Sequence, residues 1–261
     1  MPKVKIEGIE VNVRTEATIL DAAIKAGIWI PTLCYNPSLQ PQAACRLCMV
    51  ELDRGGWSQL VTACNYPVRR DIVVSVNSER AVRARRGVME LLLARSPESK
   101  ELRELAKRMG VHGTPYPKVT ESQRNCILCG MCTGVCEEVI GSSAISFAGR
   151  GVDRVVATPF RLSSADCIGC GACAIICPVG TIQIRIHEDT DEIEISPFKT
   201  RVKMLQCEGC GKRMVSELVS EKMIGRVKID WDEFRERLRL CPDCRRKKTA
   251  AAFILGMGEN T

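Results

Sequence analysis

The chain has 261 residues, a net charge of +7 and 16 cysteines, and it contains only three Trp, three Tyr and five Phe. This length is enough for two or three domains with cores of their own, whereas disulfide-rich secreted scaffolds are mostly short. The modest charge and the scarcity of aromatic rings argue against a surface that stacks nucleic-acid bases.

The N-terminus lacks the apolar stretch of a signal peptide, and no apolar run reaches the roughly 20 residues that cross a bilayer. We therefore expect a cytoplasmic protein with no membrane span. In that reducing compartment thiols stay free to bind metal, and the close spacing of the cysteines predicts metal ligands and not disulfides.

Residues 1–77 have the pattern of a small β-rich domain. Five short segments have the apolar residues of strands, and the first two form a hairpin: residues 4–6, 11–13, 49–52, 60–62 and 72–74. Thr18 and Asp21 form a capping box for a helix over residues 19–26, which Gly27 ends. Strand, strand, helix and further strands are the order expected for a β-grasp.

Four cysteines of this domain have the spacing C-x10-C-x2-C-x15-C: Cys34, Cys45, Cys48 and Cys64. Four thiolates suit a [2Fe–2S] centre, with two ligands for each iron. The loop that carries three of them is small and turn-rich, so backbone N–H groups can approach the cluster sulfurs. A four-thiolate zinc site and a set of scattered buried cysteines are the alternatives.

The sequence pattern of residues 78–120 predicts a helical linker. The apolar face of its first helix consists of Val82, Val88, Met89, Leu91, Leu92 and Leu93. Arg83, Arg85 and Arg86 interrupt this face. A second helix is expected over residues 98–109, followed by a segment rich in Gly and Pro that breaks it.

Residues 121–198 contain an internal repeat of C-x2-C-x2-C-x3-C. The two copies are Cys126, Cys129, Cys132 and Cys136, and Cys167, Cys170, Cys173 and Cys177. Two such runs are the signature of two-cluster bacterial ferredoxins, in which the fourth cysteine of each run ligates the other cluster. The predicted ligand sets are Cys126, Cys129, Cys132 and Cys177 for one [4Fe–4S] cluster, and Cys167, Cys170, Cys173 and Cys136 for a second.

Other residues of the repeat fit the same interpretation. Gly130 and Gly171 follow the second cysteine of each copy and allow the chain to wind tightly. Pro178 follows the second run, whereas Glu137 stands in that place after the first run. The negative charges of Glu137 and Glu138 are expected to lower the potential of the nearby cluster. Short strands are expected around residues 144–147 and 181–184.

Residues 199–261 carry two C-x2-C knuckles, Cys207, Cys210, Cys241 and Cys244. Two knuckles that close one tetrahedral site favour structural zinc in a zinc-ribbon-like domain. A third [4Fe–4S] cluster and a single iron remain as alternatives. Helices are expected near residues 215–223 and 231–240, and the basic tail over residues 245–248 is expected to be partly disordered.

The predicted fold class is α+β, with four segments in chain order. They are a β-grasp [2Fe–2S] ferredoxin-like domain (1–77), a helical linker (78–120), a double [4Fe–4S] bacterial ferredoxin-like domain (121–198), and a four-cysteine domain with a basic tail (199–261).

This order of modules resembles a known family of iron–sulfur subunits. The stretches that carry the resemblance are residues 30–35, 45–51, 85–93, 126–130, 136–139 and 149–151. They resemble the small diaphorase subunit of NAD-reducing hydrogenases, soluble electron-bifurcating complexes and related formate dehydrogenases, and the N-terminal part of the large iron–sulfur subunit of complex I. The resemblance covers about residues 1–185.

One departure from the complex I subunit stands out. That subunit carries a further cubane on one His and three Cys, which opens with His-x3-Cys after the leucine-rich helix. Ser96 and Lys100 occupy those places here, and no cysteine lies between Cys64 and Cys126. We therefore expect that cluster to be absent, and His112 to be a surface loop histidine.

The resemblance implies an electron relay. No G-x-G-x-x-G or P-loop motif is present, so the chain is expected to have no catalytic site of its own. The implied partners are a flavin- and NADH-binding diaphorase-like subunit, a small thioredoxin-like [2Fe–2S] subunit and a further catalytic redox subunit. Two alternatives are a succinate-dehydrogenase-type subunit, which the spacing from Cys34 to Cys45 contradicts, and a regulatory protein that binds nucleic acid.

Overall fold

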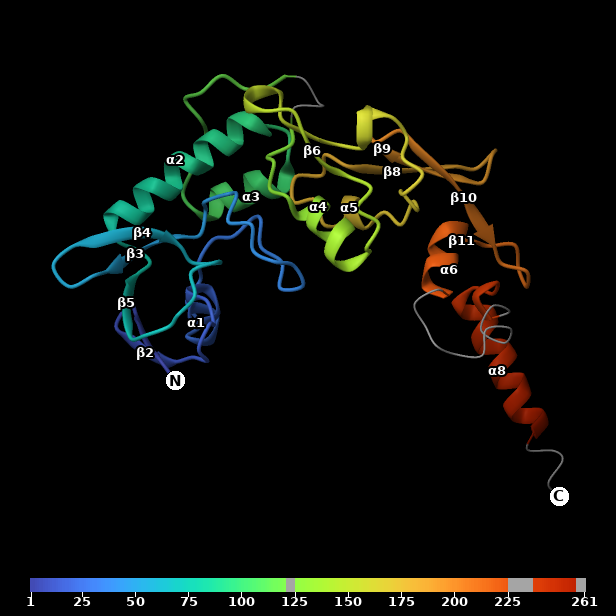
Figure 1. Ribbon diagram of the computed structural model, residues 1–261, viewed down its shortest axis with the longest axis horizontal. Coiled ribbons are helices and arrows are strands. Elements are labelled where there is room, and N and C mark those ends of the chain that lie inside the picture. Colours follow the sequence, from blue (N-terminus) through green and yellow to red (C-terminus); the bar gives the residue numbers. More distant parts are fainter. Residues whose placement is uncertain (121–124, 225–236, 257–261) are drawn as a thin grey trace. The chain divides into compact units, whose positions relative to one another are not determined.

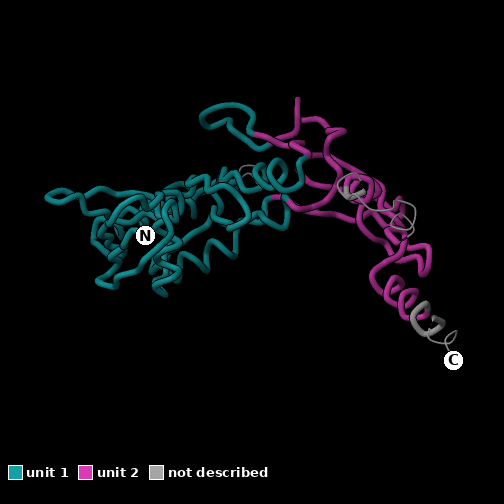
Figure 2. Tube along the Cα trace, turned by 60° about the horizontal axis from the view of Figure 1, so that its bottom comes forward, with its two compact units in different colours: residues 1–141, 147–156, 173–181 teal, residues 142–146, 157–172, 182–261 magenta. Residues whose placement is uncertain are grey.

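The computed structural model describes residues 1–120, 125–224 and 237–256 (Figure 1). The chain divides into two compact units, coloured separately in Figure 2. Unit 1 consists of residues 1–141, 147–156 and 173–181, and unit 2 of residues 142–146, 157–172 and 182–261. None of the helices in the described part of the chain has the length and apolar character needed to cross a membrane.

A five-stranded sheet forms the N-terminal part of unit 1. Its strands are β1 (Lys3–Ile6), β2 (Ile9–Asn12), β3 (Met49–Asp53), β4 (Ser58–Thr62) and β5 (Ile72–Ser75). They lie in the order β2-β1-β5-β3-β4, with β1 and β5 parallel and the other neighbours antiparallel. The predicted hairpin turn has positive φ at Glu7 and Gly8, as a tight two-residue turn requires.

Helix α1 (Ile19–Lys25) covers part of this sheet and contacts β1 and β2. Its predicted capping box is present, because the Thr18 hydroxyl accepts from the Asp21 N–H and the Asp21 carboxylate accepts from the Thr18 N–H. Alternate side chains of the strands and one face of α1 form the core, including Val4, Ile6 and Ile19. Burying each such side chain contributes about 1.5–3 kcal/mol.

Two helices follow the sheet, α2 (Glu79–Arg95) and α3 (Lys100–Arg108). Ser78 and Ser99 cap their N-termini through their hydroxyl groups. Part of the predicted apolar face of α2 is wrong, because Val82 and Leu91 are exposed whereas Arg85 is buried. Helix α2 packs on β3 and on α3.

The segment of the two cysteine runs is mostly irregular. It contains α4 (Met131–Gly134), a π-helical turn η2 (Val135–Val139), the 3-10 turns η3 (Gly151–Asp153) and η4 (Pro159–Arg161), and α5 (Ala172–Ile175). Strands β6 (Ser146–Ala148) and β7 (Val155–Ala157) pair with each other. The first of these overlaps the strand expected around residues 144–147.

Unit 2 contains a four-stranded antiparallel sheet that the sequence pattern did not predict as a whole. Its strands are β8 (Gln183–His187), β9 (Glu192–Ser196), β10 (Thr200–Gln206) and β11 (Arg213–Ser216), which lie in chain order. The pairing of β9 with β10 joins residues on both sides of the predicted boundary at residue 198.

Helices α6 (Glu217–Ile224) and α8 (Pro242–Gly256) complete unit 2. The helix predicted near 231–240 falls largely outside the described residues. Residues 245–248 are helical, in contrast to the expected disorder. Asp243 in the first turn of α8 accepts a hydrogen bond from Arg246 at 2.6 Å, and Ala250 and Ala251 favour helix.

Candidate metal centres

The four cysteines of the N-terminal domain lie at one end of the β3–β4 hairpin and in the loop before it. Cys48 immediately precedes β3 and Cys64 follows β4, and the Ala63 N–H donates to the Cys48 carbonyl at 3.0 Å. Cys34 and Cys45 come from the preceding loop, where the Cys45 N–H donates to the Cys34 sulfur at 3.3 Å. All four cysteines are buried.

These thiols form two adjacent pairs. A hydrogen bond from the Cys34 thiol lowers the pKa of Cys45 to about 6, and the same interaction raises the pKa of Cys34. Likewise, a hydrogen bond from the Cys64 thiol lowers the pKa of Cys48, while the pKa of Cys64 is raised. The structure therefore brings together Cys34 with Cys45 and Cys48 with Cys64, an arrangement in which each pair could hold one iron of a [2Fe–2S] centre.

Three cysteines of the first run lie close to the last cysteine of the second run. Burial raises the pKa of Cys132, and the charges of Cys129, Cys126 and Cys177 raise it further. Burial raises the pKa of Cys129 to about 11, with Cys177 again contributing. All of these residues belong to unit 1. These interactions support the exchange of the fourth ligand between the runs, which stays a prediction; the charge of Cys173 also acts on Cys132.

The second predicted set is divided between the two units. Cys167 and Cys170 belong to unit 2, whereas Cys136 and Cys173 belong to unit 1. This set therefore stays a prediction. Its loop has the expected local form, because Gly171 has a φ of 73°, and Gly130 has a φ of 81° at the equivalent position of the first run.

The N-terminal site and the first run share one hydrophobic core. Cys34, Cys45 and Cys129 are members of a single buried cluster with Leu47 and Met131. Cys45 is also one of the charges that raise the pKa of Cys129. Packed apolar side chains therefore lie around Cys34 and Cys45 of one site and Cys129 of the other, whereas Cys126 and Cys177 are half-buried.

No motif singles out Arg95, although it contacts the first run. Its Nε donates to the Cys126 carbonyl at 3.0 Å, and its charge opposes the rise that burial causes in the pKa of Cys126. Arginine is frequent on helices, so only its place at the end of α2, next to the first run, reveals this role.

The side chains of the last four cysteines lie close together. The sulfur atoms of Cys207, Cys210, Cys241 and Cys244 all lie within 4.8 Å of one another, and those of Cys210 and Cys241 are 3.7 Å apart. Four thiolates at about 2.3 Å around one tetrahedral ion stand about 3.8 Å apart. A cubane instead spreads its ligands over four irons and holds them farther apart. The geometry fits a single ion.

Backbone N–H groups stabilise thiolates at this site. The Cys241 N–H donates to the Cys207 sulfur at 3.1 Å, and this bond is the main reason that the pKa of Cys207 is lowered to about 6. The N–H of Cys244 likewise lowers the pKa of Cys241. In contrast, side-chain hydrogen bonds with Cys210 and Cys241 raise the pKa of Cys244 to about 12. Cys207 and Cys241 are therefore the residues of this site that most readily present thiolate, the form that binds metal.

This metal site is connected within unit 2 to the loop of the second run. The Ser216 hydroxyl at the end of β11 donates to the Ile168 carbonyl, between Cys167 and Cys170. A cavity of about 530 Å³ is lined by residues of both features, including Cys170 and Cys241.

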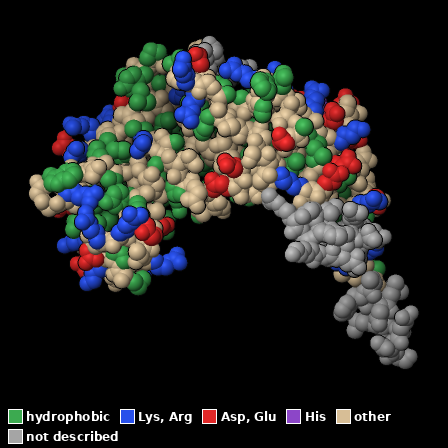
Figure 3. All heavy atoms as spheres, viewed as in Figure 1, with side chains coloured by type: hydrophobic (Ala, Val, Ile, Leu, Met, Phe, Trp, Pro, Cys, Tyr) green, Lys and Arg blue, Asp and Glu red, His purple; other side chains and the backbone are tan. Residues whose placement is uncertain are grey.

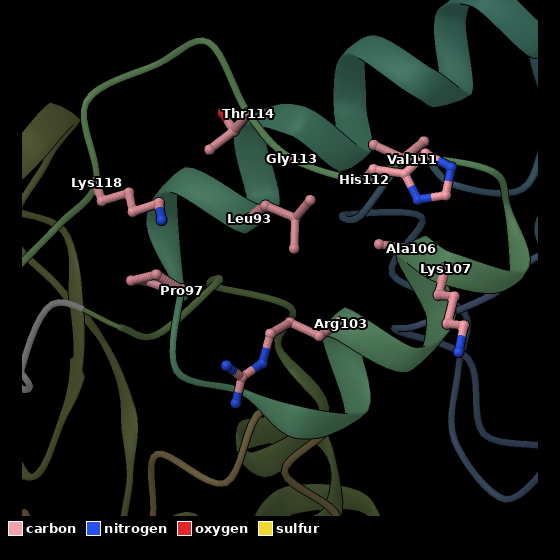
Figure 4. Close-up of a pocket in the computed structure, with 10 residues that line it drawn as sticks. All are labelled: Leu93, Pro97, Arg103, Ala106, Lys107, Val111, His112, Gly113, Thr114 and Lys118. Carbon is pink, nitrogen blue, oxygen red and sulfur yellow. The ribbon is translucent and has the colours of Figure 1, made fainter.

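The places of the His-x3-Cys motif hold no metal ligands. Ser96 is the buried C-cap residue of α2 and Lys100 is the exposed first residue of α3. Beside them lies a pocket of about 420 Å³ whose lining includes Arg103, Lys107, His112 and Lys118 (Figure 4). No cysteine lines this pocket, and His112 is exposed.

Comparisons with protein families identify two iron–sulfur domains. Residues 2–79 match the model of a 2Fe-2S iron-sulfur cluster binding domain, and residues 166–213 match a 4Fe-4S dicluster domain. The second match includes the second cysteine run and the first knuckle, but not the first run. The chain is an α+β protein with these ferredoxin-type domains and a C-terminal four-cysteine site, as predicted.

Three curated relatives are subunits of redox enzymes. The chain is 34% identical over 208 residues to the NADPH-Fe(3+) oxidoreductase subunit alpha of Geobacter sulfurreducens, which covers 70% of this chain and 24% of the relative. It is 35% identical to the NADP-reducing hydrogenase subunit HndD of Solidesulfovibrio fructosivorans, over 70% of this chain and 36% of the relative. It is 29% identical to the mitochondrial NADH-ubiquinone oxidoreductase 78 kDa subunit of Candida albicans, over 69% of this chain and 28% of the relative.

A solved structure is also similar. A chain in the crystal structure of an NAD+-reducing [NiFe]-hydrogenase in the H2-reduced state matches with a TM-score of 0.59 and 25% identity, over 69% of this chain and 85% of that chain. These homologues confirm the predicted resemblance to hydrogenase and complex I iron–sulfur subunits. The chain spans about a quarter to a third of the length of the curated relatives that it matches.

Proposed function

We propose that this chain is the iron–sulfur relay subunit of an NAD(P)H-linked multisubunit oxidoreductase of the hydrogenase diaphorase, formate dehydrogenase or electron-bifurcating type. Single electrons would pass along it between a flavin-bearing subunit and a second redox subunit. The observation that carries the proposal is the buried cluster that contains Cys34 and Cys45 of one site and Cys129 of the next.

In this proposal twelve cysteines hold three clusters. The pairs Cys34–Cys45 and Cys48–Cys64 each bind one iron of the [2Fe–2S] centre. The two [4Fe–4S] clusters use Cys126, Cys129, Cys132 and Cys177, and Cys167, Cys170, Cys173 and Cys136. One-electron transfer is the chemistry that these groups supply when bound.

Apolar residues of unit 1 position the cysteines and limit the access of water to them. Leu47, Met89 and Leu102 fill the core around Cys34, Cys45 and Cys129 and are fully buried. Such a medium does not reorganise when charge moves, whereas water would. Arg95 orients the start of the first run through the Cys126 carbonyl.

The four-cysteine site would hold zinc and carry no electrons. The short separations between its sulfur atoms favour one ion over a cubane. Zinc has no redox chemistry and is the usual occupant of closed four-thiolate sites, although a single iron fits the same geometry. Its role would be to fix the C-terminal helix α8 to the sheet of unit 2.

The proposed partners follow from the similarity to redox-enzyme subunits. They are a flavin- and NADH-binding diaphorase-like subunit, a small thioredoxin-like [2Fe–2S] subunit and a further catalytic redox subunit, all in the cytoplasm. Nucleic acid is not among them. On the face shown in Figure 3, Lys and Arg side chains are interspersed with Asp and Glu and do not form one continuous basic surface.

The test is to purify the complex anaerobically from its host through a tag on this chain. We expect about ten iron, ten sulfide and one zinc per copy of the chain. We also expect electron paramagnetic resonance (EPR) signals of its clusters to develop when NADH or NADPH is added. A content of about fourteen iron without zinc would indicate that the four-cysteine site holds a third cubane and not zinc. Clusters that dithionite reduces but neither nicotinamide reduces would contradict the relay.

A further inference from the structure

Arg85 is a buried cation beside the N-terminal metal site. It is 6% exposed, and it is the one charged residue among the buried residues of the described chain. Within α2 it shares the inward face with Ala81 and Met89, one turn before and one turn after it. Its neighbours Arg83 and Arg86 are exposed on the outer face.

Helix α2 runs along the strand that follows Cys48, since its Arg80 pairs with Glu51 of β3 at 3.4 Å. The helix packs on β3, which begins at the residue that follows Cys48. Burial lowers the pKa of Arg85, and the negative charges of Glu7 and Cys48 oppose this effect. An arginine nevertheless stays protonated in proteins, so a permanent positive charge lies within electrostatic range of a predicted cluster ligand.

The surroundings of Arg85 leave this charge incompletely balanced. One of its terminal nitrogens, Nη1, is buried and has no hydrogen-bond acceptor within the described residues. Glu7 instead accepts from the N–H of Asn77 at 2.9 Å and from that of Val76. A buried charge that lacks hydrogen-bond partners is unfavourable, so a further negative charge beside that of Glu7 would stabilise the fold here.

We propose that Arg85 is the counter-charge of the [2Fe–2S] centre on Cys34, Cys45, Cys48 and Cys64, and that it raises the reduction potential of that centre. This inference rests on the proposed function. Four thiolates and two sulfides outweigh the charge of two ferric ions, so the centre is an anion and balances Arg85. It becomes more negative when it accepts an electron.

The redox step itself is simple. When bound, the [2Fe–2S] centre would accept one electron from a neighbouring carrier, which would be oxidised, and no bond would form or break. No proton is needed, because Arg85 is charged before and after the step. The positive charge stabilises the reduced form more than the oxidised form, because their charges differ by one unit. Low-dielectric surroundings strengthen this preference.

The test is a redox titration of the purified complex with Arg85→Gln, Arg85→Met and Arg85→Lys. Without the charge, the ratio of reduced to oxidised [2Fe–2S] centre at a fixed potential should fall at least tenfold, which is about 59 mV for a one-electron couple. Arg85→Lys keeps the charge and should shift the ratio much less. Arg83→Gln removes an exposed charge of the same helix and is the matched control.

The outcomes separate the two proposals. If the wild-type complex lacks a [2Fe–2S] signal, the proposed function is wrong. If the signal is present and the ratio is unchanged in Arg85→Gln or Arg85→Met, the counter-charge is wrong. A shift in Arg85→Lys as large as in Arg85→Met would also overturn it, because packing would then explain the effect. Should Arg85→Gln fail to assemble, Arg85→Met, which buries no polar group, still decides the question.

Discussion

At the scale of single residues, the last cysteine of each run is predicted to serve the cluster of the other run. Cys177 ends the second run, yet its charge acts on Cys126, Cys129 and Cys132 of the first run. Cys126 also has a local contact, since its sulfur accepts from the Leu128 N–H at 3.4 Å. These interactions support the prediction that Cys177 shares a cluster with the first run.

This grouping predicts non-additive iron loss. Cys126→Ser and Cys177→Ser should each remove about four iron per chain, and the double variant should remove no more than either alone, because both residues hold one cubane. The measurement is iron content with EPR of the reduced protein. The combination of Cys126→Ser with Cys64→Ser is the control and should lose about six iron. A loss of about eight iron in the Cys126→Ser, Cys177→Ser double variant would show that each run holds its own cluster.

A second residue-scale prediction concerns acid stability of the β8–β9 pair. Glu194 accepts from His187 Nε2 at 2.7 Å and lies 3.1 Å from an Arg201 nitrogen, and these contacts hold its pKa below the usual value. Its stabilising contribution is present above the unfolded pKa of about 4.3 and is lost as the pH falls through the lower folded pKa.

Glu194→Gln should therefore reduce the hydrogen-exchange protection of β8 and β9 near pH 6, and its difference from wild type should shrink in acid. Glu188→Gln, elsewhere in the same sheet region, is the control. Equal protection of wild type and Glu194→Gln at about pH 6 would mean that these contacts contribute nothing.

At the scale of elements, the sequence predicted those that local signals define. The β-grasp strands and α1 follow from alternation and from the capping box of Thr18 and Asp21. The inward face of α2 could not be predicted in this way, because an arginine on an amphipathic helix is expected on the solvent side. Arg85 is buried through tertiary packing, which the local sequence does not show. The four-stranded sheet was not predicted, because β9 is only five residues long and its alternation of Glu and Ile gives a weak strand signal by itself.

The metal sites show the same division. Spacing alone identified the four groups of cysteines, because ligand spacing is a local property. The separation of the sulfur atoms, which favours a single ion at the last group, is a tertiary property and needed the structure. The contact of Ser216 with the loop of the second run is likewise invisible in the sequence, since 48 residues separate Ser216 from Ile168.

This contact gives a prediction for β11. Ser216 is 1% exposed, donates to the Ile168 carbonyl and accepts from the Val219 N–H at 3.3 Å. Ser216→Ala should destabilise unit 2 by about 1–3 kcal/mol, because it leaves buried polar groups without partners. It should also speed iron release from the cluster on Cys167 and Cys170. We expect Ser216→Thr to restore the wild-type rate.

Iron release into a chelator, followed by absorbance, is the measurement for Ser216. Ser220→Ala changes another buried serine of the same unit and is the matched control. Equal release rates in Ser216→Ala and wild type would exclude a role for this contact in holding the loop.

At the scale of the whole molecule, the two units depend on metal in different ways. Unit 1 has two hydrophobic cores, which include the residues around Cys48 and Cys64 and those around Cys34 and Cys129. In the C-terminal part of unit 2, Cys207 and Cys241 of the four-cysteine site are 2% and 1% exposed and are among the most buried of the described residues. Loss of this ion should therefore unfold the C-terminal part and leave unit 1 intact.

Cys241→Ser tests this division. We expect the zinc content to fall from about one per chain to near zero while the [2Fe–2S] signal is unchanged. Limited proteolysis should then cut within the C-terminal part first. Cys210→Ser, which changes the exposed ligand of the same site, should give the same result. Loss of the [2Fe–2S] signal in both variants would contradict the independence of unit 1.

The two knuckles stand far apart in the sequence, and this has a consequence for the unfolded chain. An ion held by Cys210 and Cys241 closes a loop of about thirty residues, as a disulfide would, and in the chain-entropy model such a closure is worth about 4 kcal/mol. A thiolate–metal bond is reversible, however, so this constraint lasts only while the ion is supplied. By mass action, the lifetime of the C-terminal part in a cell would then follow the concentration of free metal.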